Sequence, residues 1–205
     1  MPELLVSDNV LDKRQFDDTE YFKEIVFEKI DFTKLLINNK EFYKCSFIKC
    51  NFENLLFSNS DFENCVFQEC DLSLLRFNNT KLSDVDFKYC KLIGVDWTFA
   101  SKPLKINFES CLLNNSNFYA LTLGLIIVED CSLQGVDFTK ANLNKAKIVK
   151  CDLLNATFSD TILTYTDFSG SINYSINPNL NKLKKTIFSL PEALSLLSNF
   201  DIILK

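Results

Sequence analysis

Residues 40–72 read KEFYKCSFIKCNFENLLFSNSDFENCVFQECDL, with a large apolar side chain at every fifth position. The same spacing runs without a miss from Phe22 to Trp97 and, after a shift of one residue, from Phe108 to Phe168. An α-helix repeats every 3.6 residues and a strand every two, so neither makes a five-residue period. A short period sustained over most of a chain predicts a solenoid, whose units bury their apolar side by stacking.

A second inward position lies two residues before each large one. Small or apolar residues occupy most of these positions, and all eight cysteines fall there. The other three positions carry mainly polar and charged residues, which we expect to face water. Each pentapeptide is therefore predicted to be a short extended segment with one large and one smaller inward side chain.

The order small residue, Asp or Asn, then Leu or Phe resembles the pentapeptide-repeat proteins, with good matches at residues 50–54, 136–140 and 141–145. This resemblance implies an all-β solenoid, a right-handed quadrilateral β-helix with four pentapeptides per coil, over residues 20–170. We expect a single domain, 1–205, with an N-terminal cap at 1–20 and an irregular corner at 98–107. A turn, a short capping α-helix and a dimerisation tail are expected at 171–205. The candidate cap residues are Leu4, Leu5, Val10, Leu11 and Phe16.

Four pentapeptides per coil would stack residues that lie twenty apart. The cysteines obey this spacing in two runs of three that are joined by the same one-residue shift. Structural zinc sites usually pair cysteines two to four residues apart on a turn. We therefore expect buried thiols rather than a metal site or disulfides. The predicted core residues are Cys50, Cys70, Cys90, Cys111, Cys131, Cys151, Phe47, Phe67, Phe87 and Trp97.

The composition argues against several classes of function. The chain has no histidine and no glycine-rich phosphate loop, so we predict no catalytic residues, no cofactor and no small-molecule substrate. A net charge of −5 disfavours nucleic-acid binding, which needs excess Lys and Arg. No stretch approaches the ~18 apolar residues of a membrane span, and the first residues do not read as a signal peptide. We expect a cytoplasmic protein.

The acidic surface is a candidate binding site. Residues 1–101 carry 18 acidic and 12 basic side chains, whereas residues 102–205 carry 9 and 10. A negatively charged rod can imitate duplex DNA, but any soluble β-helix also needs outward polar residues. The column from Asp31 to Asp152 mixes acidic, neutral, basic and apolar residues, which tempers the DNA-mimic reading. The candidate partner-binding carboxylates are Asp61, Asp71, Asp84, Asp86 and Asp96.

Two further features are candidate contact sites. The break at 98–107 holds Lys102, Pro103 and Lys105, and it reads equally well as a functional loop or as a tolerated insertion. Leu112, Leu125 and Ile127 fall at outward positions. They form either an exposed apolar patch or residues covered by corner packing.

The C-terminal segment reads as a cap. Ser189 and Glu192 have the spacing of a capping box, ahead of leucines on one helical face. The turn at 173–178 and the Ser-Leu-Pro-Glu helix start resemble the Qnr-type and microcin-immunity branch of the family. That resemblance implies a tail-to-tail homodimer that binds DNA gyrase or topoisomerase IV, with a scaffold for an unrelated protein as the alternative. The candidate dimer residues are Leu190, Leu194, Leu197, Phe200 and Ile202.

Overall fold

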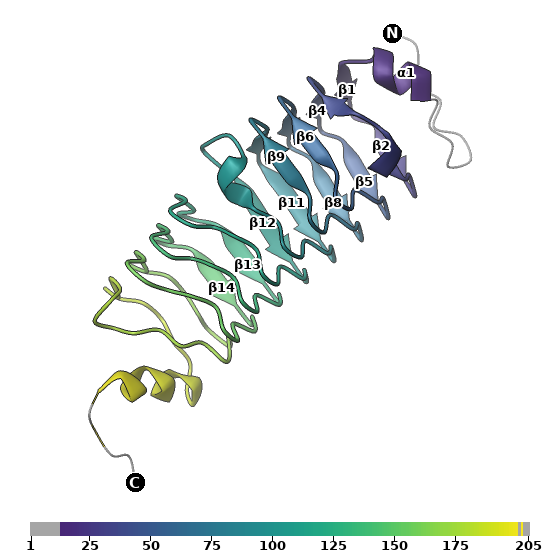
Figure 1. The fold of residues 1–205 in the computed structure, drawn as a ribbon. Coiled ribbons are helices and arrows are strands. Elements are labelled where there is room, and N and C mark those ends of the chain that lie inside the picture. The colour runs from purple at the N-terminus through teal and green to yellow at the C-terminus, as the bar shows by residue number, and fades with distance from the viewer. Residues whose placement is uncertain (1–12, 201, 203–205) are drawn as a thin grey trace.

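The computed structural model describes residues 13–200 and 202, which form a straight rod with the two ends of the chain at opposite tips (Figure 1). A short helix, α1 (Lys13–Asp18), lies at the N-terminal tip, and a 3₁₀ helix, η3 (Glu192–Asn199), lies at the C-terminal tip. Of the predicted N-terminal cap residues, Leu4, Leu5, Val10 and Leu11 lie outside the described residues. Phe16 is fully buried against Phe22, with ring centroids 5.1 Å apart.

The strands are two to four residues long and pair in parallel. Three sheets result, with the orders β1-β4-β7-β10, β2-β5-β8-β11-β12-β13-β14 and β3-β6-β9. Their bounds are β1 Tyr21–Lys23, β2 Val26–Glu28, β3 Ile37–Asn38, β4 Glu41–Tyr43, β5 Ser46–Ile48, β6 Leu56–Ser58, β7 Asp61–Glu63, β8 Val66–Gln68, β9 Arg76–Asn78, β10 Lys81–Ser83, β11 Val85–Lys88, β12 Ile106–Glu109, β13 Ile127–Glu129 and β14 Lys147–Val149. Two short 3₁₀ helices, η1 (Phe32–Lys34) and η2 (Trp97–Phe99), replace strands at two places in the coil.

The coil has four faces, each with one large inward residue per turn. Face A contains Phe22, Phe42, Phe62, Leu82 and, beyond the break, Leu123 and Leu163. Face B contains Phe27, Phe47, Phe67, Phe87, Phe108 and Val128. Face C contains Phe32, Phe52, Leu72, Leu92 and Leu113. Face D contains Ile37, Phe57, Phe77, Trp97 and Phe118. This arrangement confirms the predicted quadrilateral β-helix.

The register changes once, at the predicted break. Rungs before it pair residues twenty apart, as in Phe67↔Phe87, and the rung that crosses it pairs Val85 with Ile106. The extra residue is taken up between Ser101, whose N–H still donates to Thr80 O, and Ile106. A loop protrudes from the rod between η2 and β12, and it interrupts the ladder of face A between β10 and Thr122 (Figure 1).

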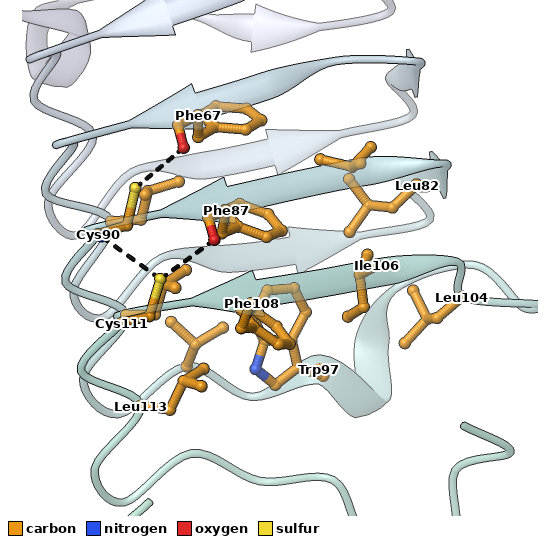
Figure 2. Packing of buried hydrophobic residues seen from close by; sticks show 14 of the residues in the cluster. Phe67, Leu82, Phe87, Cys90, Trp97, Leu104, Ile106, Phe108, Cys111 and Leu113 are labelled. Atoms are coloured by element: carbon orange, nitrogen blue, oxygen red, sulfur yellow. Dashed lines mark hydrogen bonds between the residues drawn. The ribbon is translucent and has the colours of Figure 1, made fainter. Parts of the chain in front are cut away.

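The core is built from columns of stacked rings. Phe67, Phe87 and Phe108 follow one another with centroids 5.1 and 5.3 Å apart, beside the thiols of Cys90 and Cys111 (Figure 2). Trp97 is fully buried, and its ring stacks on Phe77 at 5.1 Å. All ten predicted core residues have exposed fractions of 3 % or less. Such ring pairs add to the burial of apolar area that drives stacking.

The cysteine column satisfies backbone groups at one corner. The Cys70 N–H donates to Cys90 Sγ at 3.4 Å, and the Cys90 thiol in turn donates to Phe67 O at 3.3 Å. Ser171 takes the same role at the end of the column, where its hydroxyl accepts from the Cys151 N–H at 3.0 Å. All eight cysteines are buried and unbridged. From Cys50 to Ser171 the column therefore holds small side chains that combine a donor and an acceptor, as thiols and hydroxyls do.

The coil continues beyond residue 170, which was the predicted end of the β-helix. Bridges join Ile162 to Lys182 and Asp167 to Ile187, and the Phe188 ring stacks on Phe168 at 5.4 Å. The extension was missed because residues 173–178 break the five-residue spacing before it resumes. The predicted capping helix is present as η3, a 3₁₀ helix.

The predicted capping box does not form. The cap residue of η3 is Pro191, which makes no side-chain hydrogen bond. Ser189 Oγ instead accepts from the Gly170 N–H at 3.1 Å, and Glu192 Oε1 accepts from the Asn173 N–H at 2.6 Å. Both side chains thus tie residues 189–192 to the preceding rung.

Candidate partner-binding surfaces

The five predicted carboxylates do not share one surface. Asp61 lies on face A, Asp71 on face C, Asp86 on face B and Asp96 on face D, while Asp84 occupies the corner between faces A and B. A partner that approaches one side of the rod therefore meets only one or two of them. Residues twenty apart share a face, whereas neighbouring faces are five residues apart, so sorting outward residues by column can reveal this distribution from sequence.

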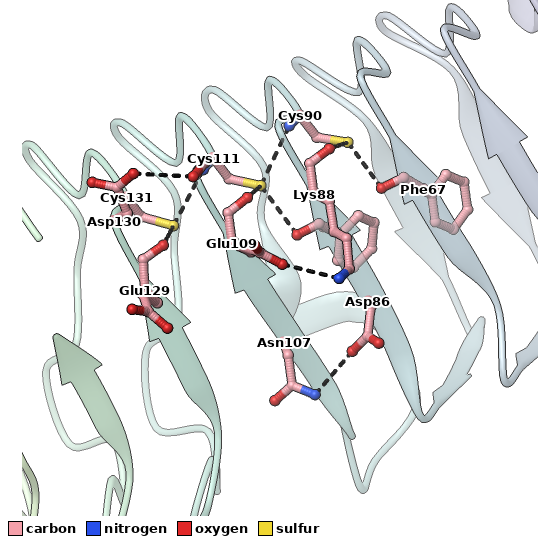
Figure 3. A network of polar contacts seen from close by, with 12 residues as sticks. Phe67, Asp86, Lys88, Cys90, Asn107, Glu109, Cys111, Glu129, Asp130 and Cys131 are labelled. Atoms are coloured by element: carbon pink, nitrogen blue, oxygen red, sulfur yellow. Dashed lines mark hydrogen bonds and ion pairs between the residues drawn. The ribbon is translucent and has the colours of Figure 1, made fainter. Parts of the chain in front are cut away.

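Each of these carboxylates also has a partner within the rod. Asp61, Asp71 and Asp84 pair with lysines one rung on, at 2.9, 3.5 and 3.7 Å from Lys81, Lys91 and Lys105. Asp86 Oδ1 accepts from Asn107 Nδ2 at 3.0 Å, as Figure 3 shows beside the Lys88–Glu109 ion pair. Asp96 Oδ1 accepts from the Thr98 N–H at 3.0 Å. Much of the negative charge is thus compensated locally, because exposed ion pairs form between neighbouring rungs.

A group of four carboxylates lies at the N-terminal end of face A, and in the described part of the chain only Asp61 among them forms an ion pair, with Lys81. Glu20, Glu41 and Asp61 line one hollow, and Glu63 follows on the same strand as Asp61. Among the described residues, the eight ion pairs use neither Glu20, Glu41 nor Glu63. We name this group, Glu20, Glu41, Asp61 and Glu63, the acidic end of face A. Of these four residues, only Asp61 was predicted as a partner-binding carboxylate. The composition of the chain does not show which acidic residues share a column.

The three predicted apolar contact residues are exposed, but they do not form one patch. Leu125 is 70 % exposed at the corner between faces A and B, and Ile127 follows it on β13. Leu112 lies on face C, in the column that also holds Lys91 and Ser132. Leu125 borders a hollow of about 320 Å³ where face A is interrupted, together with Leu104 and Lys105. The surface around the break is therefore built by Leu125 and Ile127, and Leu112 belongs to another face.

The C-terminal tip exposes a second apolar surface. Leu190, Leu194, Phe200 and Ile202 are each about half exposed or more, and Leu197 is partly covered. Behind them Tyr174 is buried with its hydroxyl unpartnered. Burial, with the nearby Glu192 carboxylate, raises the pKa of Tyr174 to about 12.

The described residues offer little for chemistry. Within 13–200 and 202, no group of three or more His, Cys, Asp or Glu side chains is placed to hold a metal ion. Hydrogen bonding to neighbouring thiols and burial raise the pKa of Cys90, so this thiol is neutral. Across the same part of the chain, no helix has the length and hydropathy needed to cross a bilayer.

Comparison with known proteins agrees with this architecture. A model described as a pentapeptide repeat region matches residues 40–102, and a model of pentapeptide repeats in eight copies matches residues 128–153 and 137–172. These matches cover more than half of the chain. Fold and repeats together define a pentapeptide-repeat β-helix. This chain belongs to the pentapeptide-repeat family.

Solved structures of the same kind are similar to this chain at low identity. A trypsin-treated form of QnrB1, a plasmid-mediated fluoroquinolone resistance protein, is 20 % identical over 91 % of this chain and 90 % of its own, with a TM-score of 0.47. HetL, a pentapeptide repeat protein involved in heterocyst differentiation regulation from the cyanobacterium Nostoc, is 15 % identical over 85 % and 89 %, with a TM-score of 0.38. A pentapeptide repeat protein of the Arabidopsis thaliana thylakoid lumen is 27 % identical over 45 % and 60 %, with a TM-score of 0.33. No curated protein has a significant sequence match to this chain.

Proposed function

We propose that this protein is a non-catalytic, cytoplasmic DNA mimic that binds a type II topoisomerase, DNA gyrase or topoisomerase IV, through the acidic end of face A. The observation that carries the proposal is the group of four carboxylates there, of which only Asp61 forms an ion pair within residues 13–200 and 202. Glu41 lies beside Asp61 on the neighbouring strand, and Glu63 follows on the strand of Asp61, so three carboxylates lie on two adjacent rungs before Lys81. Fixed negative charge on a rod attracts the same basic surfaces that bind phosphates.

The proposal also takes support from the resemblance of the C-terminal segment to the Qnr-type and microcin-immunity branch. By that resemblance the protein confers quinolone tolerance or toxin immunity. A DNA mimic of this size gains length by dimerising, and the exposed leucines in and just before η3 are the surface we assign to a tail-to-tail homodimer. Leu190 and Leu194 are the most exposed of these leucines, and a second copy would cover them.

A gyrase supercoiling assay titrated with the protein, with and without ciprofloxacin, tests the proposal. Rescue of the drug-poisoned enzyme at low protein concentration is the expected result for a resistance protein. Inhibition of supercoiling without rescue would support the mimicry and remove the quinolone part. No effect in either arm would contradict the proposal as a whole.

A scaffold for an unrelated protein is the second candidate. The observation in its favour is that Leu125 is exposed at the rim of a hollow where face A is interrupted, with Ile127 exposed two residues further on. Exposed apolar residues that rim a hollow are typical of protein contact sites. Replacing Leu125 and Ile127 by serine should abolish capture of such a partner and leave gyrase binding unchanged.

A further inference from the structure

Face A carries charges of opposite sign at its two ends. Beyond the break its outward strand positions are Asn142, Ile162 and Lys182, and Lys184 follows on the last rung. Lys145 and Lys185 occupy the adjoining corner, on either side of Tyr165. We name Lys145, Lys182, Lys184 and Lys185 the lysine end of face A. None of these four takes part in an ion pair among the described residues.

The lysine end differs from the rest of the rod in this respect. Seven of the eight described ion pairs involve lysines between Lys29 and Lys105, and Lys150 makes the eighth. The Lys185 ammonium lies over the Tyr165 ring at 5.6 Å from its centroid. Asp160 occupies the corner on the opposite side of face A from Tyr165. The lysine end is thus an exposed positive surface, whereas lysines nearer the N-terminus are mostly neutralised.

The middle of face A is mixed in polarity. The protruding loop lies there, between β10 and the rung of Thr122, beside a hollow lined by Leu125 and by the Asp84–Lys105 ion pair. Seven rungs of ~4.8 Å separate Glu41 from Lys182, or about 34 Å, and the hollow lies halfway. The two charged ends are therefore well separated along the rod.

A face with a negative end and a positive end is complementary to itself. A two-fold axis through its middle places the negative end of one copy against the positive end of the other, and it sets the protruding loops beside the hollows. We propose that face A is a self-association surface on which two copies of this chain pack antiparallel, with the acidic end of each against the lysine end of the other. This contact is isologous and therefore closes at two copies.

Charge complementarity selects a second copy as the occupant. Both halves of the match lie on the same chain, so no further partner is needed. The attraction acts over about one Debye length, ~8 Å at physiological salt, and should be strong only where the ends meet directly. This inference does not rest on the topoisomerase target, and it uses a different surface from the tail-to-tail contact at η3.

Sedimentation velocity of the full-length chain carrying Leu194→Glu and Leu197→Glu tests the inference, because these changes remove the η3 contact. We expect a dimer at about 20 mM NaCl that dissociates at about 500 mM, with Kd raised at least tenfold. Glu20→Lys, Glu41→Lys and Glu63→Lys together should give a monomer in low salt, as should Lys182→Glu, Lys184→Glu and Lys185→Glu together. Mixing the two charge-reversed proteins should restore a one-to-one complex.

Matched controls keep the test specific. Glu53→Lys on face C adds positive charge, as the first triple variant does, and Lys147→Glu on face B adds negative charge, as the second does. Both positions are exposed and lie off face A, so both variants should leave the dimer intact. Circular dichroism checks that each variant is folded. A monomer at low salt, or charge-reversed proteins that fail to associate on mixing, would overturn the inference. Binding of added duplex DNA by the lysine end, with the chain itself remaining monomeric, would also overturn the inference.

Discussion

The ammonium of Lys40 donates a hydrogen bond to the main-chain carbonyl oxygen of Phe16 at 2.8 Å, inside the N-terminal tip of the rod. The same nitrogen donates to Asp17 O and Thr19 O, and it lies 4.7 Å from the centre of the Phe16 ring. Lys40 is only 3 % exposed. It occupies the small inward position of its pentapeptide and holds the end of α1 on the first coil.

This arrangement explains how a buried lysine is tolerated. The last carbonyls of a helix lack partners within the helix, and a cation there is favourable. Desolvation lowers the pKa of Lys40, while Asp17, Glu20 and Asp18 oppose that shift. The side chain thus replaces lost water with three carbonyl oxygens.

Lys40→Met should loosen the N-terminal cap. The substitution keeps the apolar stem but leaves three carbonyls without their donor, at a cost of about 1–3 kcal/mol. Urea unfolding should show the loss, and hydrogen exchange should rise in residues 13–24. Lys44→Met, at an exposed lysine of the same pentapeptide, is the matched control. Equal stability of the two variants would refute the role of Lys40.

Tyr174→Phe should remove a pH-dependent loss of stability. Because the folded-state pKa of Tyr174 is about 12 and the usual pKa of a tyrosine is 10.0, the stabilising effect of the neutral phenol is complete below pH 10. It should fall by about 3 kcal/mol as the pH rises from 10 to 12. The Phe variant removes an unpartnered buried hydroxyl, so its stability at pH 7 should match or exceed that of the wild type. Parallel urea titrations at pH 7, 10 and 11 measure the difference, and identical pH profiles would count against it.

Cys90→Ser should be tolerated, and Cys90→Leu should not. Serine keeps the acceptor for the Cys70 N–H and the donor to Phe67 O, as Ser171 does in the same column. Leucine adds volume to a column that has no room for it, at about 1–3 kcal/mol. Thermal unfolding of both variants checks the order. A serine variant as unstable as the leucine variant would show that packing of sulfur, not hydrogen bonding, decides this position.

Charge reversal on face A should weaken topoisomerase binding more than the same reversal elsewhere. Glu41→Lys with Glu63→Lys changes two uncompensated carboxylates on one face, and we expect at least tenfold weaker binding to gyrase by surface plasmon resonance. Asp71→Lys with Asp96→Lys alters the same charge on faces C and D. Equal losses in both double variants would favour a general effect of net charge over a defined contact.

Leu194→Glu with Leu197→Glu should convert a tail-to-tail dimer into a monomer at physiological salt. The two carboxylates would be buried without partners in the proposed contact, which is strongly unfavourable. Light scattering measures the mass, and the rod should stay folded because η3 lies outside the stacked rungs. A wild-type protein that is already monomeric at physiological salt would contradict the proposed η3 dimer.

The sequence predicted the β-helix because one side-chain period specifies both which residues point inward and how rungs stack. Phe47, Phe67 and Phe87 lie twenty residues apart, and their rings follow one another in the column that this spacing predicts. The prediction failed where the period was broken. Ser189 and Glu192 have a helix-start pattern, yet both bind backbone N–H groups of the preceding rung, which the linear chain places nineteen residues away.

The five-residue period by itself determined the fold, the buried cysteine column and the position of the slip, because inward and outward positions recur at fixed intervals along the chain. Only the tertiary structure decided which charges remain uncompensated. That property depends on distances between side chains on neighbouring rungs, and the slip changes these partners, pairing Asp84 with Lys105 and Lys88 with Glu109. The bipolar face A and the burial of Lys40 therefore emerge only when the rungs are stacked in space.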